Sequence, residues 1–170
     1  MTYRDPKTGR WAAKTSLVFV YGTLMRPYHN NRVLQDARGE FVGEAVTVES
    51  YVMLYAGYPY VVKALGDDQV LHRVKGEVWR VRDSEVWRLD RLEGYGHGRP
   101  AEQNHYNREK IDVELYPFVD SMGDMWRAFI YFGNPRYAAR AINNPVLPNP
   151  DGLLVYPGPR WEQEDEREEA

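Results

Sequence analysis

Short apolar runs and alternating apolar and polar positions fill the middle of the chain, and both patterns predict strands. Residues 17–21, Leu-Val-Phe-Val-Tyr, form a continuous apolar run between polar neighbours. A run of this length is typical of a strand that is buried on both faces. A later apolar stretch is interrupted at residues 49–50, where Glu-Ser allows a turn between two strands. The further expected strands cover residues 41–48, 51–55, 60–64, 74–81, 111–115 and 126–132.

One helix is clearly signalled, over residues 84–93. Asp83 has the side chain of a good N-cap, and Gly94 can end the helix in the left-handed conformation. A second, shorter helix is predicted over residues 134–141. Many short strands with one clear helix predict an α+β domain whose sheet closes, or nearly closes, into a barrel.

The two ends of the chain differ in composition from the middle. Residues 1–15 contain Pro6 and Gly9 among scattered charges, and residues 162–170 are nearly all acidic. Like charges repel one another and stay solvated, and such segments bury too little apolar surface to fold alone. We therefore expect a flexible N-terminal extension at residues 1–15, one domain at residues 16–161 and a disordered acidic tail at residues 162–170.

Composition narrows the function classes. The chain of 170 residues has no cysteine, which excludes disulfides, thiolate metal ligands and a Cys nucleophile. The histidines lack the spacing of a metal site, and positions in a solvated loop are expected for His97 and His105. The net charge of -3 gives no reason to expect nucleic-acid binding. No apolar run approaches the roughly 20 residues that span a bilayer, and residues 1–16 lack a signal-peptide pattern, so we expect a cytoplasmic protein without a membrane partner.

The first candidate for chemistry is the segment Tyr21, Gly22, Thr23 and Leu24, at the end of the first expected strand. A strand that stops at Gly can turn sharply, because Gly reaches positive φ without a Cβ clash. Backbone N–H groups in such a turn can bind a carboxylate or an amide oxygen, and Thr23 adds a hydroxyl. An ordinary strand-to-loop turn explains the same residues, because Gly is common in turns.

The second candidate is Glu93. Because a helix has 3.6 residues per turn, Val86 and Leu89 lie on the same face as Glu93, which points its carboxyl toward the core. Burial raises the pKa of a carboxyl and makes it a better proton acceptor near neutral pH. Two structural roles compete with catalysis: exposure at a frayed helix end, or an ion pair with an Arg such as Arg108. Asp90, one turn earlier, is expected to be a structural hydrogen-bonding residue.

Both candidates belong to a series of motifs that resembles the γ-glutamylcyclotransferase-like superfamily, which includes γ-glutamylamine cyclotransferases and the plant AIG2-like proteins. The resemblance covers about residues 17–132, and it is specific because five motifs follow one another in the right order. These are Val-Phe-Val-Tyr-Gly-Thr-Leu at 18–24, Gly-Tyr-Pro at 57–59, Lys-Gly-Glu-Val-Trp at 75–79, Leu-Asp-Arg-Leu-Glu at 89–93 and Tyr-Asn-Arg at 106–108.

The resemblance implies a small mixed β-barrel with flanking helices. It also implies a cyclotransferase that releases 5-oxoproline and an amine from a γ-glutamyl amine or peptide, with Glu93 as the acid/base. No cofactor is expected, because nucleophile and electrophile belong to one molecule. The expected partner is thus a small γ-glutamyl substrate, and the sequence favours no particular oligomeric state. The residues expected to bind this substrate are Tyr21, Gly22, Thr23, Leu24, Gly57, Tyr58, Pro59 and Tyr106.

Residues 94–105 depart from the family pattern as an insertion between helix and strand, which either forms a lid or only lengthens a loop. Two other functions stay open, because a fold does not settle an activity. One is a non-catalytic module that binds a small carboxylate or amine in the same cleft. The other is a related acyl-transfer or amide-cleaving enzyme, in which water or a second amine attacks.

Overall fold

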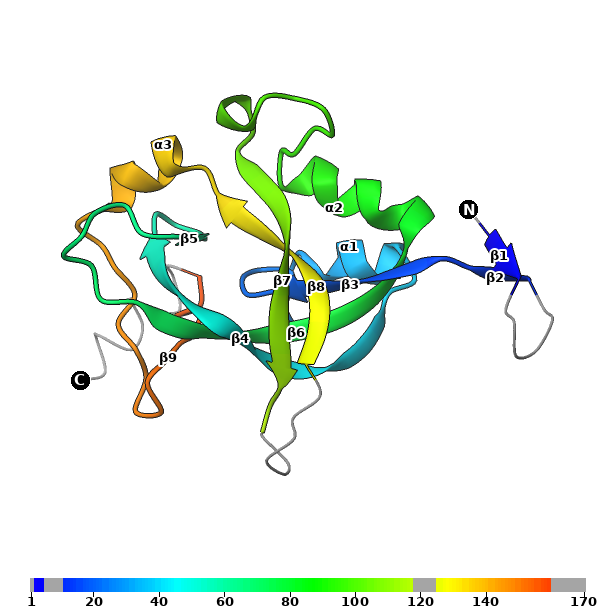
Figure 1. The fold of residues 1–170 in the computed structure, drawn as a ribbon, viewed down its shortest axis with the longest axis horizontal. Coiled ribbons are helices and arrows are strands. Elements are labelled where there is room, and N and C mark those ends of the chain that lie inside the picture. The colour runs from blue at the N-terminus through cyan, green and yellow to red at the C-terminus, as the bar shows by residue number, and fades with distance from the viewer. Residues whose placement is uncertain (1, 5–10, 118–124, 160–170) are drawn as a thin grey trace.

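Five strands close into a barrel in the computed structural model, which describes residues 2–4, 11–117 and 125–159 (Figure 1). Around the ring the order is β4, β7, β8, β3 and β6, and pairing of β6 with β4 closes it. Only the β3–β8 contact in this ring is parallel. The predicted α+β fold, a small mixed β-barrel with flanking helices, is therefore confirmed. The barrel strands are β3 (Thr15–Val20), β4 (Glu40–Tyr55), β6 (His72–Arg82), β7 (Tyr106–Leu115) and β8 (Met125–Gly133).

Shorter elements extend and cover the barrel. Strand β5 (Pro59–Val62) pairs with β4, and β9 (Leu153–Leu154) pairs with β6. The helices are α1 (Asn31–Asp36), α2 (Val86–Leu92) and α3 (Pro135–Ala138), together with the 3-10 turns η1 (Asp83–Glu85), η2 (Ala101–Gln103) and η3 (Ala139–Ala141). No helix among the residues that the structure describes is long and apolar enough to cross a membrane.

Strand β3 lies between two apolar clusters, as expected of a strand buried on both faces. Phe19 and Tyr21 belong to a cluster built from barrel strands, which fills the barrel. Val18 and Val20 belong to a second cluster, which also contains Leu34 of α1 and residues of α2. Figure 1 shows these two helices on the same side of the barrel. The end of β3 is therefore held firmly where the candidate loop begins.

The turn predicted at residues 49–50 is wrong, because β4 runs through this position without a break. Instead, the register of β4 against β6 shifts between Val46 and Ser50. The hydroxyl of Thr47 donates to Glu49 O at 2.7 Å and accepts from Val74 N at 2.9 Å. A buried threonine thus satisfies backbone groups at a bulge, where one strand gains residues relative to its neighbour.

The expected N-cap at Asp83 is also wrong. A 3-10 turn precedes α2, and neither start has a side-chain cap. Asp83 instead accepts a hydrogen bond of 2.8 Å from the Ser16 hydroxyl, which links the turn to β3. The predicted end of the helix is confirmed: Gly94 has φ 63°, Gly94 N donates to Arg91 O at 3.4 Å, and Tyr95 N donates to Asp90 O at 2.8 Å. These bonds form a Schellman motif, which places Glu93 as the last residue before the chain reverses.

The remaining sequence predictions concern the second helix and the two ends of the chain. The short helix predicted over residues 134–141 is present as α3 and η3, and the Asn134 side chain caps it by accepting from Arg136 N. Helix α1 was not predicted. The extension predicted at residues 1–15 contains regular structure, because β1 (Thr2–Arg4) and β2 (Trp11–Ala13) form a separate antiparallel pair and β3 begins at Thr15. The predicted acidic tail lies outside the described residues.

Candidate active site

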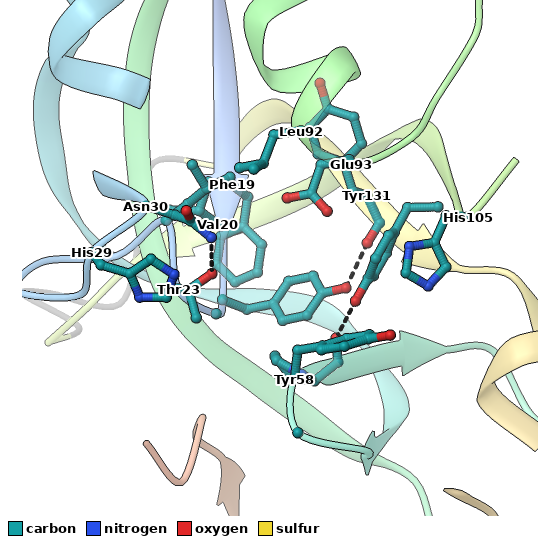
Figure 2. Close-up of a pocket in the computed structure, with 16 residues that line it drawn as sticks. Phe19, Val20, Thr23, His29, Asn30, Tyr58, Leu92, Glu93, His105 and Tyr131 are labelled. Carbon is teal, nitrogen blue, oxygen red and sulfur yellow. Dashed lines mark hydrogen bonds between the residues drawn. The ribbon is translucent and has the colours of Figure 1, made fainter. Parts of the chain in front are cut away.

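A pocket of about 340 Å³ opens beside the end of β3 (Figure 2). Its walls come from the loop after β3, the loop before β5, the end of α2, the start of β7 and the middle of β8. Every residue predicted for the site lines this one pocket. The structure therefore brings together Tyr21, Gly22, Thr23, Leu24, Gly57, Tyr58, Pro59, Glu93 and Tyr106.

The loop after β3 presents backbone donors to the pocket. Met25 N donates to Gly22 O at 2.9 Å, which folds residues 22–25 into a turn. Within the described part of the chain, the N–H groups of Gly22, Thr23 and Leu24 donate to no protein acceptor. Successive N–H groups of this kind can bind an anionic or carbonyl oxygen. We refer to residues 22–24 as the donor loop.

Gly22 is needed for a close approach rather than for the positive φ that the sequence suggested, since its φ is not in that region. A Cβ at this position would lie 2.8 Å from Pro59 Cγ. Real Cβ atoms almost never come so close, so a larger residue would push the donor loop away from the loop before β5. The glycine thus brings together the two loops that form this side of the pocket.

Two polar side chains hold the donor loop, and a third holds the segment that follows it. Asn30 donates to the Thr23 hydroxyl at 2.8 Å, and Asn31 donates to Leu24 O at 2.7 Å. Further along, the buried Glu77 carboxylate accepts from Arg26 N and from Arg26 Nε, both at 3.2 Å. The loop is therefore tied at several points before any ligand binds, which lowers the cost of ordering it.

Glu93 directly follows α2 as its C-cap residue and projects into the pocket (Figure 2). Its backbone is fixed on both sides, because Glu93 N donates to Leu89 O at 2.9 Å and Tyr106 N donates to Glu93 O at 3.2 Å. The residue retains some exposed surface at the pocket, but protein atoms surround the carboxyl, and this desolvation raises its pKa to about 8. The helix end is thus not frayed into solvent.

No protein group in the described residues forms a hydrogen bond or ion pair with the Glu93 carboxyl, although tyrosines surround it. The Tyr21 hydroxyl donates to Tyr131 O at 2.6 Å, and the Tyr106 hydroxyl donates to Pro59 O at 2.8 Å. The Tyr131 hydroxyl donates to Asp90 at 2.7 Å. All three hydroxyl protons are donated to acceptors other than Glu93, so the Glu93 carboxyl is available to a bound molecule.

The ion pair suggested between Glu93 and Arg108 is wrong, because Arg108 pairs with Asp90 instead. Arg108 Nη1 lies 3.0 and 2.9 Å from the two Asp90 oxygens, and Tyr131 adds a third hydrogen bond. The Arg108 and Asp90 side chains are only 17% and 16% exposed. Asp90 therefore has the structural hydrogen-bonding role that the sequence suggested, and it is the partner of Arg108.

Arg108→Met should lower the free energy of unfolding by about 1–3 kcal/mol, because Asp90 loses its charged partner in a largely dry site. Methionine keeps the apolar packing of the arginine stem. Urea unfolding measures the loss. Arg127→Met is the matched control, since the Arg127–Asp112 pair is 61% and 44% exposed and such pairs contribute roughly 0–1 kcal/mol. Equal losses in the two variants would contradict a structural role for the Asp90 pair.

The raised pKa of Glu93 predicts a pH-dependent stability. Folding favours the protonated carboxyl, so this stabilisation is complete below the ordinary value of 4.5 and is lost as pH rises toward about 8. Glu93→Gln lacks this loss, and it should therefore gain stability relative to wild type between pH 5 and pH 8. Urea unfolding of both proteins at the two pH values measures the difference. A gap between them that stays constant with pH would show that the carboxyl is not desolvated.

Several pocket residues were not predicted. They are Phe19, Val20, His29, Asn30, Leu92, His105 and Tyr131. The expectation that His105 lies in a solvated loop is wrong, since it is partly buried and shares a hydrogen bond of 2.7 Å with the Tyr60 hydroxyl. Its position directly before the Tyr106 motif was the one available signal. Among the residues described, no group of three or more acidic or histidine side chains could hold a metal ion.

Comparison with known proteins decides the family. Residues 18–152 match the family model described as gamma-glutamyl cyclotransferase, AIG2-like. The chain belongs to this family. The matched segment includes every residue predicted for the site, so the family resemblance and the pocket involve the same part of the chain.

Individual members of the family are similar to this chain in sequence and in structure. A gamma-glutamylaminecyclotransferase from Bos taurus is 39% identical over 114 residues, which is 65% of this chain and 61% of the bovine protein's length. One from Rattus norvegicus is 29% identical over 153 residues, covering 82% of this chain and 95% of the rat protein. The crystal structure of an AIG2-like protein from Mus musculus superposes with a TM-score of 0.60 at 26% identity, covering 85% of this chain and 97% of the mouse chain.

Proposed function

We propose that this protein is a cyclotransferase that releases 5-oxoproline and an amine from a γ-glutamyl amine or γ-glutamyl peptide. The observation that carries the proposal is the unpaired, desolvated Glu93 carboxyl in the same pocket as the donor loop. An acceptor for an amine proton thus lies beside N–H groups that suit a carboxylate or carbonyl oxygen. The names of the bovine and rat relatives agree with this chemistry.

In the proposed reaction the donor loop binds oxygens of the glutamyl group. Glu93 takes a proton from the α-amino group, and the freed lone pair attacks the substrate's own γ-carbonyl carbon. A C–N bond closes the five-membered ring, the bond to the leaving amine breaks, and Glu93 returns the proton to that amine. Both reacting groups belong to one molecule, so orientation supplies much of the rate. Donors aimed at the γ-carbonyl oxygen would stabilise its developing charge.

The Glu93 pKa of about 8 suits this role. A general base works best when its pKa lies near the working pH, because it is then basic enough to take the proton and still ionised in part. A carboxyl with an ordinary pKa of 4.5 would be a weak base toward an amine. The absence of a protein partner for Glu93 in the described residues leaves that charge for the substrate's amino group.

The proposal is tested by mass-resolved product analysis with purified protein and a panel of γ-glutamyl amines and peptides. We expect 5-oxoproline together with the free amine. Release of glutamate would indicate attack by water, and a new γ-glutamyl amide would indicate transfer to a second amine. Tight binding across the panel without any product, measured by calorimetry, would favour the non-catalytic module.

A further inference from the structure

The pocket has an aromatic side that the proposed reaction does not yet use. We name it the aromatic wall and define it as Tyr58, Tyr60, His105 and Tyr106. The rings of Tyr58 and His105 meet edge to face at 5.7 Å, and those of Tyr60 and Tyr106 stack at 5.2 Å. All of these except Tyr60, which packs behind, line the pocket. Tyr58 is 43% exposed, so it has ring surface left for a ligand.

The aromatic wall begins next to the donor loop, where Pro59 approaches Gly22, and extends away from it to His105. Figure 2 shows Thr23 and His105 on opposite sides of the Glu93 carboxyl, with Tyr58 below it. The inference rests on the proposed function, in which the donor loop binds the glutamyl group and Glu93 faces its amino group. The leaving amine is attached at the far end of that group, so it extends toward the aromatic wall.

The aromatic wall carries no fixed charge. The residues that line the pocket include neither Lys nor Arg, and Glu93 is their only acid. Burial lowers the pKa of His105, which keeps its ring neutral near pH 7. Arg140 is the nearby cation, but its guanidinium packs 5.5 Å from the Tyr137 ring and does not line the pocket. A leaving amine that bore a carboxylate would therefore meet no cation in the pocket, and Glu93 would repel it.

The aromatic wall is also held in place. His105 N donates to Gly94 O at 3.3 Å, and Asn134 N donates to His105 O at 3.0 Å. The Tyr60 hydroxyl contacts His105 Nε2, as described above. Residues 94–105 are thus anchored at their end rather than hanging as a lid.

We propose that the aromatic wall binds the leaving amine, and that this protein prefers γ-glutamyl amines whose amine carries an uncharged aromatic ring. Rings in a site of this kind gain from edge-to-face or offset stacking beyond the area that they bury.

Three matched substrates test this preference through kcat/KM for 5-oxoproline release. γ-Glutamyl-2-phenylethylamide has the ring, γ-glutamyl-2-cyclohexylethylamide replaces it by a saturated ring, and γ-glutamylphenylalanine adds a carboxylate. We expect the first to exceed the second by about 3–10-fold, the size of one ring–ring contact. We expect it to exceed the third by about tenfold or more, because a charge without a partner is costly in a partly dry pocket.

Substitutions at Tyr58 assign the preference to the aromatic wall. Tyr58→Leu should reduce the phenyl-over-cyclohexyl ratio to about 1–2, since one ring contact is removed, whereas Tyr58→Phe should keep it. Trp87→Leu is the matched control, because Trp87 is an exposed aromatic residue of α2 outside the pocket. An equal ratio in wild type and Tyr58→Leu, or a wild-type preference for γ-glutamylphenylalanine, would overturn the inference.

A binding experiment separates this inference from the proposed function. Calorimetry of the same three compounds with Glu93→Gln measures their affinities without turnover. The same order of affinities supports the aromatic wall even if the wild-type protein releases no 5-oxoproline, and in that case only the proposed function fails. Turnover of all three compounds with equal kcat/KM and equal affinities would overturn the aromatic wall and leave the proposed function intact.

Discussion

Glu93→Gln is expected to lower kcat for 5-oxoproline release by about 10²–10⁴-fold, the usual contribution of a general acid or base. Glutamine keeps the shape of the side chain but cannot take a proton from the substrate's amino group. Because no described protein group pairs with the carboxyl, the change breaks no internal ion pair or hydrogen bond. The loss should therefore reflect chemistry and leave the fold intact.

The measurement is steady-state release of 5-oxoproline from one γ-glutamyl amine, together with a urea titration of each protein. Glu102→Gln is the matched control, since Glu102 is exposed in η2 and lies outside the pocket. It removes the same charge from the neighbouring loop and should change kcat less than about twofold, as expected for a surface position. Wild-type activity in Glu93→Gln would end the proposed mechanism, whatever the substrate.

Much of the barrel could be predicted from the sequence, because each strand carries a local period. The run at residues 17–21 and the alternation at residues 111–115 both correspond to observed strands. Closure of the barrel was less accessible, since it depends on pairing between strands that are not consecutive in the chain, such as β4 with β6 and β3 with β8. Two contacts explain the wrong turn at residues 49–50: Ser50 pairs with Arg73 of β6, and the Thr47 hydroxyl donates to Glu49 O, so β4 stays extended through the two polar residues.

The site could be predicted in part. Helical phase alone placed Glu93 on the inner face, and the Gly94 cap turned out to keep it there. The same phase also brings Asp90 close to Glu93, so the sequence could not decide which of them pairs with Arg108. That choice depends on the position of β7 relative to α2, which brings Arg108 to Asp90. The register between distant elements, rather than the local sequence pattern, therefore decides which carboxylate pairs with Arg108.

Apart from the position of His105 directly before the Tyr106 motif, the residues that were missed lack a local signal. Asn30 acts through a hydrogen bond to Thr23 within an irregular loop. Such a loop has no repeating pattern of apolar and polar residues from which a role could be predicted. His105 looked solvated because its loop is rich in glycine, yet Asn104, its neighbour, is almost fully buried and accepts from Gly96 N. A buried amide of this kind closes a loop on itself, and its effect appears only when the loop is folded.

The largest expected effect on stability belongs to Gly76→Ala, with a loss of about 3–5 kcal/mol in the free energy of unfolding. Gly76 lies on β6, beside the end of the neighbouring strand β3. A Cβ there would overlap the carbonyl oxygen of Val20 and would lie 2.7 Å from the Phe19 ring. Neither group can move without a loss of stability, because Val20 is in a paired strand and Phe19 is fully packed in the cluster that fills the barrel.

Gly43→Ala is the matched control, since Gly43 is also in a barrel strand but its Cβ would meet only Leu115 at 3.4 Å. This substitution should be neutral to within about 1 kcal/mol, because the lower chain entropy of alanine offsets a mild contact. Urea unfolding monitored by tryptophan fluorescence measures both. If the two substitutions lower the free energy of unfolding equally, close packing of β6 against β3 is not the reason for glycine at position 76. If Gly76→Ala alone is costly, the glycine of the Gly-Glu motif serves the barrel, and the end of β3 that carries the donor loop depends on it.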